Sequence, residues 1–168
     1  MSEGDRGAGA GEGAPPFGLD AFLPYRMTRV AEEVSRRFAR AYKDRYGMTR
    51  PEWRAIAVIG TLGEVTASDI RDHSTMHKTM VSRALAGLET RRWIARDPHP
   101  ADGRAEVIRL TKQGAAAWAD LLAMAEAWQA GLISALGTEA EALAPALAAI
   151  ETRLGVAGPI LRGEGEDD

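Results

Sequence analysis

Four side chains that donate hydrogen bonds or carry positive charge lie close together in the middle of the chain: Lys78, Thr79, Ser82 and Arg83. Because a helix turns by about 100° per residue, these four share one face. The other face of the same helix is an apolar stripe of Val81, Ala84, Leu85 and Leu88. Short polar and basic groups presented outward suit the base edges and phosphates of a DNA groove. The spacing favours nucleic-acid recognition, with a merely solvated helix face as the alternative.

A short helix is expected just before this one. Thr66-Ala-Ser-Asp69 resembles a capping box, so a helix begins at Thr66 and runs to about His73. The next helix must then start near Met76 or His77 to keep its apolar stripe in register. Histidine is a poor cap, which leaves the exact start open. Two short helices joined by a tight turn form a helix-turn-helix.

A β-hairpin is expected after these helices. Strand-like runs cover 93–97 and 106–110, and the turn between them carries Asp102-Gly103 beside Arg104. The fold class is therefore mainly α with a small β-hairpin wing, a winged helix-turn-helix.

Longer helices flank this segment. A helix from Leu23 to near Gly47 combines an apolar stripe with an arginine-rich one, and a second runs from Arg50 or Pro51 to Leu62. Thr111 is expected to cap a long helix, and Thr138-Glu-Ala-Glu141 to form the capping box of the last one. The apolar residues of these two recur at heptad-like spacing: Trp118, Leu121, Ala125, Trp128, Leu132 and Leu136, then Leu143, Leu147, Ile150 and Leu154. So many apolar positions predict a dimer interface.

The expected domain organisation has three parts. Residues 1–18 form a disordered, acidic, glycine-rich tail, and 163–168 form a second acidic tail. Residues 19–162 form one domain, with the winged helix-turn-helix at 50–112 and dimerisation helices at 20–47 and 112–155.

Charge along the chain agrees with this division. The net charge is -3, yet residues 70–112 hold nine basic and five acidic residues, while the two ends are acidic. The absence of cysteine excludes disulfides and thiolate metal sites. We expect no membrane-length apolar run and a cytoplasmic protein. No arrangement typical of an enzyme is seen, and no cofactor is expected.

The chain resembles the MarR (multiple antibiotic resistance regulator) family of transcriptional regulators. The resemblance covers roughly Leu23 to Leu154 and is most specific at 80–83, 102–104 and 109–114. It implies a homodimer that binds double-stranded DNA, with a recognition helix in each major groove and the wing in the flanking minor groove. His77, where related sequences tend to have Asp or Ser, and the acidic tails depart from the family pattern.

Carried over by position, the resemblance assigns DNA-contacting residues. Phosphate contacts are expected from Lys78, Arg91, Arg92 and Arg96, and base contacts from Thr79, Ser82 and Arg83. Arg104 is expected in the minor groove, with Asp102 supporting it. The function implied is repression at a pseudo-palindromic operator; the alternative is a winged-helix module that binds another protein without specific DNA binding.

Members of this family commonly respond to small aromatic or anionic molecules in a cleft between the dimer helices and the winged domain. Tyr25, Arg29 and Trp53 are the expected effector residues, and a phenolic acid or an acyl-CoA thioester the expected ligand. The arginine stripe has a plainer interpretation as a solvated face, and Trp118 and Trp128 as core or interface residues. His73 and His77 are four apart, but the turn between them and the lack of a third ligand argue against a metal site.

Overall fold

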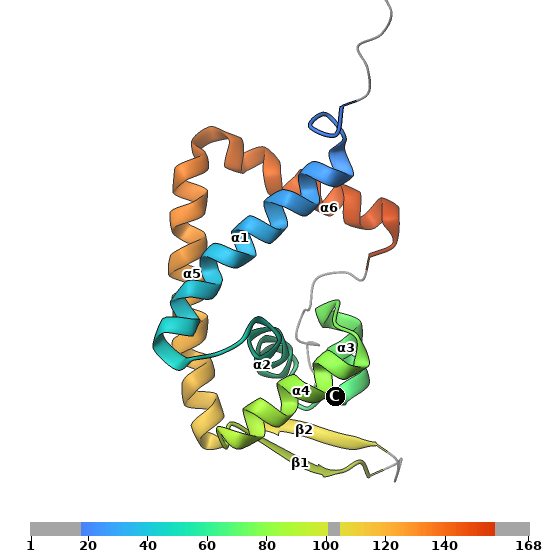
Figure 1. The fold of residues 1–168 in the computed structure, drawn as a ribbon, viewed down its shortest axis with the longest axis vertical. Helices are drawn as coiled ribbons and strands as arrows, with labels where there is room; N and C mark the ends of the chain where they lie inside the picture. Colours follow the sequence, from blue (N-terminus) through green and yellow to red (C-terminus); the bar gives the residue numbers. More distant parts are fainter. Residues whose placement is uncertain (1–17, 101–104, 157–168) are drawn as a thin grey trace, which may run out of the picture. The chain divides into compact units, whose positions relative to one another are not determined.

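The computed structural model describes residues 18–100 and 105–156 (Figure 1). These residues form two compact units, one ending at Arg37 and the other beginning at Phe38, so the boundary falls within the first helix. The elements are α1 (Leu23–Tyr46), α2 (Arg50–Leu62), α3 (Ala67–Ser74), α4 (Lys78–Thr90), β1 (Ile94–Pro98), β2 (Glu106–Leu110), α5 (Lys112–Leu136), η1 (Gly137–Glu139) and α6 (Ala140–Leu154). This order confirms a mainly helical fold with a hairpin wing.

Helices α2, α3 and α4 pack together around an aliphatic core within the second unit. The apolar stripe expected for α4 is buried in full, because it faces α2 and α3. The largest fully buried side chains of this core include Ile56, Ile59, Ile70, Val81, Leu85, Leu88, Ile108 and Leu121. Truncating one of these leucines to alanine typically costs about 2–5 kcal/mol, so α4 is held rigidly from its inner side.

The hairpin is antiparallel, with Ile94 opposite Leu110 and Pro98 opposite Glu106. Its first strand begins one residue later than the sequence indicated. Val65, just before the N-cap of α3, extends this small sheet: Val65 and Ile108 exchange two backbone hydrogen bonds of 3.0 and 2.7 Å. The base of the wing is thereby fixed to the start of the helix-turn-helix. β1 contacts α4, whereas β2 contacts α2, α3 and α5 (Figure 1).

Side-chain caps define the starts of α2, α3 and α5. The Thr66–Asp69 capping box forms as expected, and Thr111 accepts a hydrogen bond from the backbone nitrogen of Gly114 at 3.0 Å. The backbone hydrogen bond from Thr66 lowers the pKa of the Asp69 carboxyl. A further capping box at the start of α2, between Thr49 and Glu52, was not anticipated from the sequence.

The capping box expected between Thr138 and Glu141 is wrong. The chain forms a 3-10 turn from Gly137 to Glu139, and α6 begins at Ala140 without a side-chain cap. Gly137 has a φ of 61°, so α5 ends there in a conformation that disfavours other residues. Thr138 consequently lies in the turn, with its hydroxyl 3.4 Å from Glu139 Oε2.

Helices α5 and α6 leave much of their apolar surface uncovered. Leu143 and Leu147 are 44% and 41% exposed, and Leu154 is 72% exposed. By length and composition alone, the stretch Lys112–Leu154 is apolar enough to cross a membrane, and its most apolar window is not buried within the chain. Such a stretch was not expected from the sequence. These helices therefore present apolar surface that the described part of the chain does not cover.

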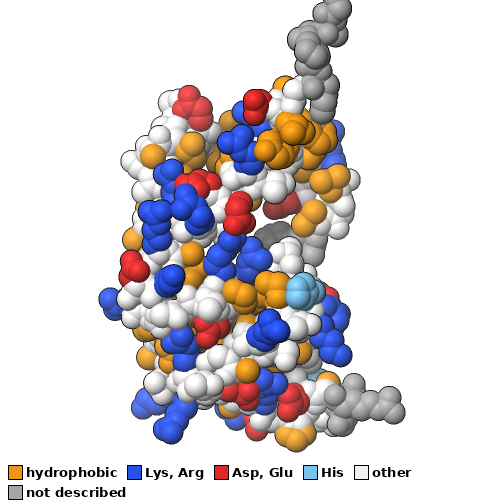
Figure 2. All heavy atoms as spheres, in the orientation of Figure 1, with side chains coloured by type: hydrophobic (Ala, Val, Ile, Leu, Met, Phe, Trp, Pro, Cys, Tyr) orange, Lys and Arg blue, Asp and Glu red, His pale blue; other side chains and the backbone are white. Residues whose placement is uncertain are grey.

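The first unit consists of the N-terminal part of α1 and the turn before it. Its large apolar side chains, including Leu23, Met27 and Val30, are exposed. Figure 2 shows hydrophobic side chains at the surface over this end of α1, with basic and acidic side chains following the helix. This helix end, like α6, therefore offers apolar surface for a contact outside the chain.

Candidate nucleic-acid interface

The outward face of α4 is built as the sequence indicated. Lys78, Thr79, Ser82 and Arg83 are all exposed. Within the described ranges none of the four has a hydrogen-bond or ion-pair partner. A rigid helix with a row of uncommitted donors can adapt these side chains to an external ligand without breaking internal contacts.

The start of α4 lacks a side-chain cap. His77 occupies the N-cap position with extended backbone but makes no capping hydrogen bond there. Its poor capping ability was expected from its residue type. The first amide groups of α4 therefore remain available to an anion such as a DNA phosphate, which a helix N-terminus favours.

Arg96 on β1 is committed to internal ion pairs. Its Nη2 lies 2.7 Å from Glu89 Oε2 on α4, and its Nη1 lies 3.3 Å from Glu106 Oε2 on β2. The side chain is 25% exposed. Arg96 thus links the wing to the C-terminal end of α4, and a phosphate would have to compete with two carboxylates for it.

Arg91 is also engaged within the protein. Its guanidinium donates to the backbone oxygens of Tyr46 and Gly47, at 2.7 and 3.1 Å, and to Glu52 Oε1 at 3.2 Å. The neighbouring Arg92 is different, because it is exposed and has no ion pair in the part of the chain described here. Of the three arginines expected to contact phosphates, Arg92 alone is presented freely.

Arg92 also has an unusual backbone conformation. Its φ is 59°, the left-handed region that costs non-glycine residues about 1–2 kcal/mol. This conformation forms the turn from α4 into the wing and directs Thr111 Oγ1 onto the Arg92 carbonyl at 2.7 Å. A cation in a strained turn at the end of the recognition helix is a candidate phosphate contact.

The tip of the wing, with Asp102 and Arg104, lies outside the described residues, and their roles stay predictions. No group of three or more His, Cys, Asp or Glu side chains suited to a metal occurs in the described residues. His73 directs its Nδ1 toward the backbone oxygen of Asp69, 2.9 Å away.

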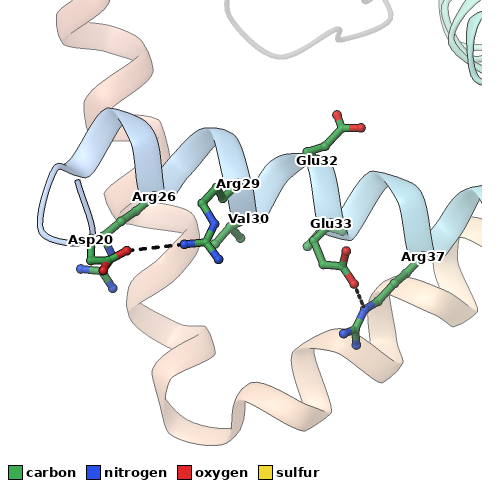
Figure 3. Close-up of a pocket in the computed structure, with 8 residues that line it drawn as sticks. Asp20, Arg26, Arg29, Val30, Glu32, Glu33 and Arg37 are labelled. Atoms are coloured by element: carbon green, nitrogen blue, oxygen red, sulfur yellow. Dashed lines mark hydrogen bonds and ion pairs between the residues drawn. The ribbon is translucent and has the colours of Figure 1, made fainter. Parts of the chain in front are cut away.

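Tyr25 and Arg29, two of the expected effector residues, lie in the first unit. The Arg29 guanidinium is 5.7 Å from the centre of the Tyr25 ring, and its Nη1 is 3.6 Å from Asp20 Oδ1. A surface hollow of about 620 Å³ runs along this face of α1 (Figure 3). Arg37 and Glu33 form a second pair in it, at 2.6 Å. Carboxylates thus neutralise positive charge of the arginines in this hollow, which makes the hollow a poor site for an anion.

Those arginines also act on the pKa of Glu33. Hydrogen bonds from Arg37 and then Arg36 lower it, so this carboxylate stays ionised next to them. Arg29, Arg36 and Arg37 therefore have their own counterions within the first unit.

Trp53, the third expected effector residue, belongs to an aromatic cluster in the second unit. Its ring stacks on Tyr42 with centroids 5.5 Å apart, and lies 5.0 Å from Phe38 and 6.1 Å from Trp118. Trp128 packs on Phe38 from the other side, at 5.5 Å. Trp118 and Trp128 are thus packed against the core. Burial raises the pKa of Tyr42.

Trp53 also lines a cavity of about 280 Å³ that is open to the surface between α2 and the end of α3. The polar groups at this cavity come from Arg54, Thr61, His73 and Ser74. Ser74 is only 7% exposed, and its Oγ has no hydrogen-bond partner in the described structure. A buried hydroxyl without a partner carries a free-energy cost. Nothing in the residue pattern near Ser74 marked this site in advance.

Comparison with known proteins agrees with this geometry. A family model described as MarR family matches residues 46–105. A MarR family transcriptional regulator from Silicibacter pomeroyi DSS-3 is 27% identical, with a TM-score of 0.72 over 82% of this chain and 98% of that one. A MarR/EmrR family regulator from Acinetobacter sp. ADP1 is 21% identical, with a TM-score of 0.72 over 83% and 99%.

A third similar structure is Bordetella bronchiseptica BpsR, a protein whose DNA binding is regulated by 6-hydroxynicotinic acid. It is 17% identical to this chain, with a TM-score of 0.70 over 86% of this chain and 100% of that one. No curated protein matches the chain.

Proposed function

Because this chain belongs to the MarR family of transcriptional regulators, we propose that it is a cytoplasmic, homodimeric repressor that a small effector releases from DNA. The observation that carries the proposal is the outward face of α4. Lys78, Thr79, Ser82 and Arg83 project from a helix whose opposite side is buried. Such a helix can enter a major groove without disturbing the core.

The chemistry of each side chain determines its proposed contact with DNA. Lys78 and Arg92 bind phosphates and supply the salt-dependent part of the affinity. Thr79, Ser82 and Arg83 read base edges, with arginine suited to guanine. Arg104 enters the minor groove and Asp102 supports it.

A second copy of the chain is the proposed partner of the uncovered apolar surface. Leu143, Leu147 and Leu154 recur along one side of α6 and are exposed, and the N-terminal end of α1 is exposed and apolar as well. A symmetric dimer buries such faces and presents two recognition helices. Two helices spaced about 34–36 Å apart would bind a pseudo-palindromic operator.

Selection from a randomised duplex pool tests DNA recognition. The purified protein should enrich a two-fold symmetric sequence whose half-sites lie about 10–10.5 base pairs apart. Fluorescence anisotropy on the selected duplex should then show weaker binding for Lys78→Ala and Arg83→Ala, and wild-type binding for the control Lys43→Ala on α1. Equal affinity for every duplex, or a monomer in light scattering, would contradict the proposal.

We further propose the cavity beside Trp53 as the effector site. An aromatic ring can pack on Trp53 while a carboxylate pairs with Arg54. The Ser74 hydroxyl, which is buried and without a partner in this structure, would bond a polar ligand atom after rotating toward the cavity. A cavity of about 280 Å³ holds a small aromatic acid, whereas the nucleotide part of an acyl-CoA thioester would remain outside it. The volume of this cavity is the observation that supports a phenolic acid as the proposed ligand.

The cavity wall suggests how a ligand acts on DNA binding. Its far side is the end of α3 and Thr75, which lead directly into α4. A ligand weakens DNA binding only if it prefers a conformation in which the recognition helices are placed differently.

Calorimetry with 4-hydroxybenzoic acid and 6-hydroxynicotinic acid tests the site. Arg54→Gln and Ser74→Ala should each weaken binding, and Arg40→Gln, on α1, should leave it unchanged. Binding that survives both cavity substitutions would place the effector elsewhere.

A further inference from the structure

Arg91 follows the last residue of α4 and contacts two other helices. Its three donor groups reach the carbonyl oxygens of Tyr46 and Gly47 and the carboxylate of Glu52, at 2.7 to 3.2 Å. The side chain is 27% exposed. Tyr46 and Gly47 end α1, and Glu52 lies in the first turn of α2. One guanidinium therefore joins the ends of α1 and α4 to the start of α2; we call these four residues the Arg91 junction.

Each acceptor in the junction has a physical need for Arg91. The last carbonyls of a helix have no partner within the helix, and a cation there also interacts favourably with the helix dipole. Glu52 is 6% exposed, and a buried carboxylate needs a counter-charge. A planar guanidinium can satisfy all three acceptors, whereas a lysine ammonium cannot match this fork geometry.

Glu52 strengthens the junction from the other side. Its carboxylate accepts from the backbone nitrogen and the hydroxyl of Thr49, at 2.7 and 2.9 Å, and also lies directly against Gly87 of α4. A Cβ at position 87 would overlap Glu52 Oε1. A larger residue at position 87 would therefore require the Glu52 side chain to move from this position.

Two aromatic rings complete the surroundings. The Arg91 guanidinium lies 5.3 Å from the centre of the Trp93 ring, and Trp93 packs edge-on against Tyr46 at 5.3 Å. Trp93 is 6% exposed. The charge of Arg91 is thus compensated, hydrogen-bonded and packed within the protein, unlike that of the neighbouring Arg92.

From this geometry we propose that Arg91 is a positioning residue for DNA binding and does not contact phosphate. It fixes the C-terminal end of the recognition helix α4 against the end of α1 and the start of α2. The orientation of Lys78 to Arg83 in the groove then depends on this link. The inference rests on the proposed DNA-binding function and reassigns one residue within it.

The test distinguishes a positioning role of the Arg91 side chain from a direct charge contact with DNA phosphate. The probe is the duplex that the wild-type protein selects, and binding is measured from low to moderate salt. Arg91→Lys keeps the charge but loses the fork, and is expected to weaken binding about tenfold with the wild-type salt dependence. Arg91→Gln should weaken binding similarly, again without changing the salt slope.

Lys43 and Arg92 supply the matched controls. Lys43→Gln removes an exposed cation on α1 that is not among the proposed DNA contacts, and should bind as the wild type does. Arg92→Gln should reduce the slope of log affinity against log salt by about one phosphate contact. Circular dichroism and light scattering give the folded, dimeric fraction by which each affinity is corrected.

Several results would overturn the inference. Wild-type affinity for Arg91→Lys, or a reduced salt slope for Arg91→Gln, would make Arg91 a phosphate contact. A lower melting temperature with unchanged affinity per folded dimer would make its role purely structural. If Arg91→Lys does not fold, Glu52→Gln replaces it, because the amide keeps an oxygen that can cap the helix but loses the charge that pairs with Arg91. Weaker DNA binding of this variant at an unchanged salt slope supports the proposal. Unchanged DNA binding refutes it. Failure of the wild type to bind DNA would refute the proposed function itself.

Discussion

The phenol of Tyr46, at the end of α1, donates a hydrogen bond of 2.7 Å to the carboxylate of Asp120 on α5. Arg45 adds two hydrogen bonds of 2.6 Å to the same carboxylate. The hydrogen bond from Tyr46, and then that from Arg45, lowers the pKa of Asp120 below its ordinary value of 3.8. Tyr46 also belongs to the Arg91 junction. Its hydrogen bond to Asp120 therefore links α5 to the same end of α1.

Asp120 should make the stability of the protein depend on pH in the acid range. Because its pKa is lower in the folded state, its stabilising contribution is present above about pH 4 and is lost as the pH falls through the folded pKa. Asp120→Asn removes that contribution, so the melting temperature of the variant should fall less steeply below pH 4. The exposed Asp44→Asn is the control. Parallel melting curves for wild type and Asp120→Asn would contradict the prediction.

Arg92→Gly should separate stability from DNA binding. Glycine adopts the φ of 59° without strain, so the variant should be more stable by about 0.5–1 kcal/mol in urea unfolding. It loses the cation, so its affinity for DNA should fall and depend less on salt. Arg92→Gln, which loses the charge but keeps the strain, should not gain stability. A less stable Arg92→Gly would show that the left-handed turn carries no strain.

Gly114→Ala should strongly destabilise the protein. A Cβ at Gly114 would overlap the backbone carbonyl of Trp93, and backbone cannot move aside as a flexible side chain can. The expected cost is about 1–3 kcal/mol in chemical unfolding. Gly131→Ala, in the same helix with nothing near its Cβ position, should instead stabilise by about 0.5–1 kcal/mol. Equal effects at the two positions would be inconsistent with this packing.

Charges on the apolar side of α6 should disrupt the proposed dimer. Leu143 and Leu147 are uncovered within the chain, and burying two carboxylates between copies is unfavourable. Light scattering of Leu143→Glu/Leu147→Glu should show monomers, with loss of binding to a two-fold symmetric duplex. Thr152→Glu, on the opposite side of α6, should remain dimeric. A dimeric double variant would move the interface away from α6.

Much of the fold follows from local patterns. The caps at Thr66 and Thr111 and the buried stripe of α4 involve residues three or four apart, and such spacing is visible in the chain itself. The Thr49–Glu52 capping box has the same residue spacing and could have been predicted from the sequence in the same way. The capping box predicted at Thr138 does not form, because a 3-10 turn begins at the left-handed Gly137. Thr138 therefore lies within that turn and does not cap α6, although the sequence motif matches a capping box.

The sequence by itself determined which side of α4 is buried and which residues face outward, since helical periodicity and residue polarity decide both. Only the tertiary structure decided that Arg91 and Arg96 are held by internal acceptors while Arg92 is presented freely. All three are arginines near one another in the chain, and their types do not distinguish them. The partners of Arg91, such as Tyr46 and Glu52, lie 45 and 39 residues away, and only the tertiary packing brings those acceptors within hydrogen-bond distance. The partners of Arg96 are nearer in the chain, at 7 and 10 residues, but they meet Arg96 only because the hairpin folds back beside α4.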